Sequence, residues 1–271
     1  MTTEQHMLSR LSIPSRAAAI FTTLFFSFFL VAASGCASTD DLGFPQTLVA
    51  PYNTRQGDTV WAVGPMRNES GVSALDPLQI SDILAATLQQ TRGVSVAPLN
   101  RTLGAMRALG LKQIASPADA KQLAAQMGVD AIVVGTITAW DPYNPPQLGL
   151  SLALYGRSGS DQLALNQHQG LDPRMLESAV TNSRLPKGQN DSEPLSIVSK
   201  HFDGANDEVL FALRAYAQGR HDANSPLGWR SYLASMSLFT KFACFRLTGE
   251  LLDRERLRLA RLHATTQAST R

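Results

Sequence analysis

The 271-residue chain has little of what most enzymes and metal proteins need. It contains two cysteines, Cys36 and Cys244, and five histidines. No histidine stands at metal-ligand spacing from another histidine, a cysteine or a carboxylate, and no Gly-x-Ser-x-Gly, P-loop or Gly-x-Gly-x-x-Gly sequence occurs. The sequence therefore predicts no metal site, no cofactor and no catalytic residue, and it favours a protein that is not an enzyme.

An excess of charge of one sign is also lacking. The chain has 24 basic and 22 acidic side chains, and residues 36–271 have 22 and 21, because Arg10, Arg16 and Glu4 lie before them. A protein that binds nucleic acid usually presents a basic stripe to the phosphates. We therefore expect no nucleic-acid partner.

Long hydrophobic runs are absent after the N-terminus. One run of 17 uncharged residues extends from Ala17 to Ala33, behind a segment that carries Arg10 and Arg16. Its length suits the hydrophobic region of a secretory signal. An uncleaved signal anchor and ordinary secretion are the alternatives.

The end of this run decides between them. The residues Ala33-Ser34-Gly35-Cys36 resemble the bacterial lipobox, in which the cysteine thiol receives diacylglycerol before cleavage on its N-terminal side. Ala33 departs from the more common leucine. We expect cleavage between Gly35 and Cys36, and a membrane anchor of diacylglycerol and palmitate on Cys36. Ala37 follows instead of the aspartate that often retains a lipoprotein at the inner membrane, so we expect the outer membrane, facing the periplasm.

The remainder predicts an α/β fold, a mixed sheet flanked by helices with a C-terminal helical hairpin. Strand-like runs at residues 59–63, 94–98, 131–138 and 148–155 alternate with helical spacing opened by Asp76-Pro77, Asn100 and Ser116-Pro117. The expected organisation is a signal peptide at 1–35, a flexible tether at 36–58, an α/β core at 59–155, a polar loop at 156–193, an edge strand and C-terminal helical hairpin at 194–262, and a disordered tail at 263–271.

The C-terminal part contains a broad apolar stripe behind Ser225-Pro226, which we expect to begin its second helix. The stripe comprises Trp229, Leu233, Met236, Phe239, Phe242, Ala243, Leu247 and Leu251. Such a stripe is more often core than a membrane or partner face. Cys244, among phenylalanines, is expected to be a small buried hydrophobe. The basic run that begins at Asp253 predicts a solvated helix end, with contact to anionic lipid or cell-wall polymer as the alternative.

The block from Val60 to Tyr155 resembles the periplasmic domain of the curli secretion channel lipoprotein family and its relatives. These include the lipoprotein activators of penicillin-binding proteins and the N-terminal domain of the Tol-Pal translocation protein. The resemblance rests on the turn Val63–Ser70, the segment Val96–Arg101 and, most specifically, Met127–Thr138. It implies a sheet flanked by helices and a scaffolding role in the envelope, without an enzyme activity.

Three hypotheses follow. The first is a non-enzymatic envelope lipoprotein that binds a protein partner in secretion, cell-wall or surface assembly. The second is an oligomeric secretion channel of curli type, so a homo-oligomer is left open as a further partner. The third and least favoured is an envelope hydrolase, which would need clustered polar side chains at the ends of strands near Pro98, Thr138 and Phe202.

Overall fold

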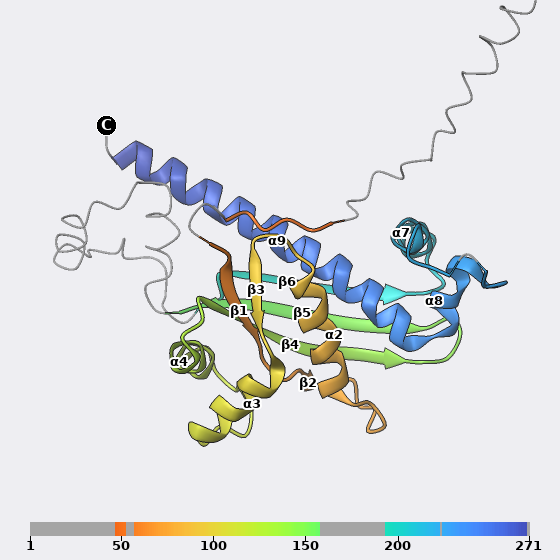
Figure 1. Ribbon diagram of the computed structural model, residues 1–271, viewed down its shortest axis with the longest axis horizontal. Coiled ribbons are helices and arrows are strands. Elements are labelled where there is room, and N and C mark those ends of the chain that lie inside the picture. The colour runs from red at the N-terminus through yellow and green to blue at the C-terminus, as the bar shows by residue number, and fades with distance from the viewer. Residues whose placement is uncertain (1–46, 53–56, 158–192, 223, 270–271) are drawn as a thin grey trace, which may run out of the picture. The chain divides into compact units, whose positions relative to one another are not determined.

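The computed structural model describes residues 47–52, 57–157, 193–222 and 224–269, all within the compact unit Phe44–Arg271. Figure 1 shows a sheet crossed by one long helix. In chain order the elements are β1 (Thr59–Val63), β2 (Arg67–Asn68), α2 (Pro77–Gln89), β3 (Val94–Ala97), α3 (Leu99–Ala108), α4 (Pro117–Met127), β4 (Ala131–Asp141), β5 (Gln147–Gly156), β6 (Ser196–Asp203), α7 (Asp207–Ala217), the 3₁₀ turn η2 (Gly228–Arg230), α8 (Ser231–Ala234) and α9 (Met236–Ser269).

The sheet is mixed. Its order is β3-β1-β4-β5-β6, and the short β2 also pairs with β4. The pairs β1–β3, β1–β4 and β2–β4 are parallel, whereas β4–β5 and β5–β6 are antiparallel. The expected fold class, a mixed sheet flanked by helices, is confirmed, and β6 is an edge strand as the sequence predicts. The C-terminal helices are α7, which is seen nearly end-on in Figure 1, and the long α9, which runs diagonally across the view.

Helix caps follow the predicted sequence signals. The Asp76 side chain caps α2 by accepting from the Leu78 N–H. Ser116 and Asp119 form a reciprocal capping box at the start of α4, and Gly128 ends α4 at φ 67°, a left-handed conformation that suits glycine. The start of α3 differs from the prediction, because Pro98 rather than Asn100 occupies its N-cap position.

Two apolar clusters lie on opposite faces of the sheet. The larger cluster packs α2 and α9 against one face and includes Val133, Leu150 and Phe242. The smaller packs α3 and α4 over β1 and the first half of β4, where Ile132 is fully buried. The start of β4 is therefore covered on both faces, as its continuous apolar sequence predicts.

The apolar stripe of the C-terminal segment is core, as expected. Phe239, Phe242, Ala243, Leu247 and Leu251 are all completely buried. The second C-terminal helix begins at Met236 rather than at Ser225, because a 3₁₀ turn and the four-residue α8 precede it.

Two expected boundaries are wrong. Residues 47–52 do not belong to a free tether, because Leu48 and Ala50 are buried and the Ala50 N–H donates to the carbonyl of Arg92. The segment 263–271 is not wholly a tail, since α9 continues to Ser269. Residues 47–52 are ordered by contacts distant in sequence, with Arg92 and with Arg256 of α9. The signal at 1–35 and most of the polar loop at 156–193 lie outside the described residues.

Candidate functional site

The residues for which the sequence predicts covalent chemistry, Gly35 and Cys36, lie outside the part of the chain that the structure describes. Cys244 is completely buried, and burial raises the pKa of its thiol to about 12. The thiol is therefore an inert core side chain, as predicted. Asp130, directly before β4, has a structural role, because its Oδ2 accepts a hydrogen bond from the Val60 N–H of β1 at 2.9 Å.

No described group of three or more histidine, cysteine, aspartate or glutamate side chains is placed to hold a metal ion. Among the described helices, none is long and apolar enough to cross a membrane.

The sheet has one face that its helices cover only in part. Cross-strand register places Val134, Ala153 and Ile197 in one row on this face, and Thr136, Ser151 and Ser199 in the next. Alternate residues of the same strands point to the opposite face, where α9 covers them. We call the surface made by β4, β5 and β6 on the side away from α9 the open face.

A groove of about 420 Å³ lies on the open face, between the chain around Pro65–Asn68 and the loop Lys112–Pro117. We call it the open-face groove. Its floor is formed by Val134, Thr136, Ser151, Ala153, Tyr155 and Ile197. The charged side chains in its lining are Arg67 and Lys112, so the groove combines an apolar and hydroxyl-bearing floor with a basic rim.

One wall of the groove is held by short polar side chains. The backbone N–H of Met66 donates to Ser81 Oγ at 2.8 Å, which fixes the strand exit onto α2. Asn68 Oδ1 accepts from the backbone and hydroxyl of Ser70 at 3.0 and 2.7 Å, and Asn68 Nδ2 donates to the Val72 carbonyl. The Asn-x-Ser sequence of this turn thus has a local structural role, and an ion pair between Arg67 and Glu69 lies beside it.

The other wall ends at the start of α4. Asp119 Oδ2 accepts from the backbone N–H groups of Ala115 and Ser116 at 3.0 and 2.9 Å. Desolvation raises the pKa of Asp119, but the hydrogen bonds from Ala115 and Ser116 outweigh it, so the pKa lies below its ordinary value. The loop that borders the groove is therefore tied down by the charged form of this carboxylate. Because the pKa is lowered, this support is present above the ordinary pKa and is lost as pH falls through the lowered value.

The lining of the open-face groove contains no histidine, cysteine or carboxylate. Its floor instead combines the hydroxyl groups of Thr136, Ser151 and Tyr155 with the apolar row of Val134, Ala153 and Ile197. The exposed His201 lies on the same face, beyond the groove, opposite Gly149.

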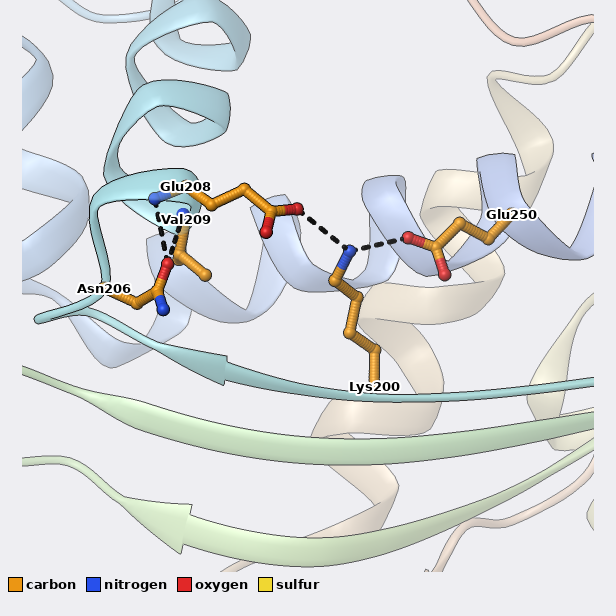
Figure 2. Close-up of polar contacts among 5 residues, drawn as sticks. All are labelled: Lys200, Asn206, Glu208, Val209 and Glu250. Atoms are coloured by element: carbon orange, nitrogen blue, oxygen red, sulfur yellow. Dashed lines mark hydrogen bonds and ion pairs between the residues drawn. The ribbon is translucent and has the colours of Figure 1, made fainter.

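On its covered side, β6 is joined to α9 and α7 by ion pairs (Figure 2). Lys200 Nζ reaches Glu250 of α9 at 2.9 Å and Glu208 of α7 at 3.9 Å. Asn206 caps α7 by accepting from the N–H groups of Glu208 and Val209. Glu208 is mostly exposed, so its pairing contributes little, whereas Glu250 links the edge strand to α9.

A buried carboxylate that sequence reasoning missed lies one turn further along α9. Glu255 is completely buried and receives hydrogen bonds from Arg258 at 2.7 and 2.8 Å, from Ser196 Oγ at 3.0 Å and from the Tyr52 hydroxyl at 3.2 Å. Burial, followed by the Glu255 charge, raises the pKa of Tyr52 well above its ordinary value. This network joins residues 47–52, β6 and α9. The only sequence signal was the i,i+3 spacing of Glu255 and Arg258 within a run that otherwise indicated a solvated helix.

No protein-family model matches the sequence, and no curated protein matches it. Solved structures similar to the chain include the LpoB C-terminal domain from Salmonella enterica, at 19% identity and a TM-score of 0.30, over 35% of this chain and 71% of that one. A PelC dodecamer from Paraburkholderia phytofirmans is 19% identical, with a TM-score of 0.26, over 39% and 64% of the two chains. Lipoprotein GNA1162 from Neisseria meningitidis is 15% identical, with a TM-score of 0.36, over 62% and 99%. At these scores the family membership implied by the sequence resemblance stays a proposal.

Proposed function

We propose that this chain is a non-enzymatic lipoprotein of the bacterial envelope, anchored through Cys36, which presents the open-face groove to a protein partner. Residues 1–35 act as its signal peptide, and its site is the periplasmic side of the outer membrane. The lipobox-like sequence Ala33-Ser34-Gly35-Cys36 supports the anchor. Secretion, cell-wall synthesis and surface assembly are the processes in which such a scaffold would act.

The observation that carries the partner-binding role is the incomplete cover of the open face. Ile197 is 58% exposed there, near the start of the edge strand, while its neighbours Ser196 and Val198, which point to the opposite face, are buried. A sheet face that faces only water normally carries polar residues at such positions. The row Val134–Ala153–Ile197 instead places aliphatic side chains at the bottom of a groove with a basic rim, which favours contact with another polypeptide over solvent.

The groove is tested by photo-cross-linking in intact cells. A photo-reactive phenylalanine derivative replaces Ile197, and the matched control carries the same group at Leu227, which is 50% exposed and precedes α8. We expect a discrete protein adduct from position 197 and none of the same mass from position 227. The substitution Ala153→Arg fills the groove from the adjacent strand and should remove the adduct. Equal adducts from both positions, or an adduct that survives A153R, would contradict the role of the groove.

The anchor is tested separately. Replacing Cys36 by Ser should abolish incorporation of labelled palmitate, while A153R should leave the label unchanged. Label that persists in C36S would refute the lipid anchor and leave the groove experiment unaffected.

A further inference from the structure

The last described turns of α9 carry an outward face of unusual composition. Leu257 is 54% exposed, and Ala260 and Ala264 are exposed along the same line of the helix. Arg254 and Arg261, three residues before and four after Leu257, are exposed beside it. An apolar strip bordered by arginines is the pattern of a helix that lies on a membrane surface, because the strip enters the headgroup region while the guanidinium groups bind phosphates.

The opposite side of the same turns is firmly bound to the protein. Glu255 and Leu259 are buried, and Glu255 is held by Ser196 and the Tyr52 hydroxyl. This part of α9 is therefore a fixed element of the fold that presents a defined face. Arg254 and Arg261 therefore point away from the sheet because helix geometry places them on the outer side of α9.

The chain from the proposed anchor arrives beside this helix. Leu48 Cδ2 lies within contact distance of the position that a side chain on Gly249 would occupy, and Arg256 donates to the Val49 carbonyl at 3.4 Å. Ten residues lie between Cys36 and Thr47, and the eleven Cα–Cα steps that join them span about 40 Å at most when fully extended. An acylated Cys36 thus confines α9 to the neighbourhood of the bilayer surface.

We infer that the exposed face of α9 formed by Arg254, Leu257 and Arg261 rests on the anionic phospholipid surface to which Cys36 is anchored. This inference rests on the proposed lipid anchor. The contact gives the anchored domain a second point of attachment, and the resulting orientation decides which way the open-face groove points.

The test supplies the anchor chemically, so that its outcome does not depend on lipidation in the cell. The protein used is the chain from Cys36 onward, which contains the whole compact unit. Its Cys36 thiol is coupled to a maleimide lipid in vesicles. The thiol of Cys244 does not react with the maleimide because it is buried. A photo-reactive phenylalanine derivative replaces Leu257, with Leu227 as the matched position. Vesicles of phosphatidylcholine with and without phosphatidylglycerol are irradiated, and lipid adducts are counted by mass spectrometry.

We expect lipid adducts at position 257 that increase when phosphatidylglycerol is present, and only background at position 227. Arg254→Gln and Arg261→Gln should each lower the yield about fivefold, because one arginine near an anionic surface contributes roughly one kcal/mol. Arg107→Gln, at an exposed position of α3, should leave the yield of lipid adducts unchanged. Any of three outcomes would overturn the inference. The first is equal yields at positions 257 and 227, and the second is a yield independent of phosphatidylglycerol. The third is adducts to protein instead of lipid when the Leu257 variant is irradiated in cells. Palmitate label that persists in C36S, or that is missing from the unsubstituted chain, would instead refute the anchor alone.

Discussion

The two faces of the sheet are made by alternate residues of the same strands, yet they serve different purposes. On β5 the side chains of Leu148, Leu150, Leu152 and Leu154 are buried beneath α9 and α2, whereas Ser151, Ala153 and Tyr155 are only half-buried on the open face. The covered face has large buried apolar groups, and the open face has hydroxyl groups and a partly exposed apolar row that form the floor of a groove. The contrast separates residues that hold the fold from residues that are available for binding.

The sharpest expected contrast concerns Cys244, on the covered side. Because burial raises the pKa of the thiol to about 12 from an ordinary 9.0, the thiolate fraction at neutral pH falls about a thousandfold. An alkylating reagent should therefore leave Cys244 intact in the folded protein and modify it completely in denaturant, as measured by mass spectrometry. Labelling at the same rate in both states would show that the covered face opens readily.

The second expected effect is on stability. Phe242 is completely buried, and its ring lies 5.8 Å from that of Phe202 and 5.9 Å from that of Phe239. Phe242→Ala should lower the free energy of unfolding by about 3–5 kcal/mol, since it leaves a cavity between α9 and the sheet. Phe211→Ala, at a half-exposed position of α7, should cost under about 1 kcal/mol in the same urea titration. Equal losses would contradict the assignment of the core to the covered face.

The third prediction concerns the buried network on α9. Glu255→Gln keeps the size of the side chain but removes the charge that pairs with Arg258, and it should cost about 3 kcal/mol of unfolding free energy. Glu250→Gln provides the matched control on the same helix, because the Lys200–Glu250 pair is partly exposed and its loss should cost under about 1 kcal/mol. Chemical denaturation of both variants measures the difference, and a Glu255 variant as stable as the Glu250 variant would refute the anchoring role.

The smallest contrast compares neighbours in one strand. Val198 is buried beneath α9, and Ile197 next to it is exposed on the open face. Val198→Ser should cost about 2 kcal/mol, because it buries a hydroxyl group and removes apolar contacts. Ile197→Ser should change stability by less than about 0.5 kcal/mol. Thermal unfolding of the two variants measures this difference, and a large loss from I197S would mean that the open face is part of the core.

Local features of the chain were largely predictable. The pairs Asp76-Pro77 and Ser116-Pro117 mark helix starts because their side chains satisfy the first free N–H groups. The alternation of leucines from Leu148 to Leu154 indicates a strand with one buried face, and that face is buried. These signals depend only on a few neighbouring residues, so they could be read in sequence order.

The buried network around Glu255 and the order of residues 47–52 could not be predicted from neighbouring residues in this way. The run from Asp253 to Arg261 indicates a solvated helix, but Glu255 is completely buried, and besides Arg258 it accepts hydrogen bonds from Ser196 and Tyr52, which lie 59 and 203 residues away. The segment 47–52 lies within the stretch 36–58 for which the sequence predicts a tether, yet it is ordered against α9. Both outcomes depend on partners that are distant in sequence, and no local pattern records them.

By itself the sequence determined the caps of α2 and α4, the mixed α/β class and the apolar stripe that forms the core, whereas the lipobox-like sequence at Cys36 stays a prediction. Only the tertiary structure decided which face of the sheet stays open, because that depends on where α9 and α4 dock. Alternation in β5 shows that the strand has two different faces, but it does not say that α9 covers one of them and leaves a groove on the other. Burial is a property of the whole packed domain, and it therefore appears only once distant segments have been brought together.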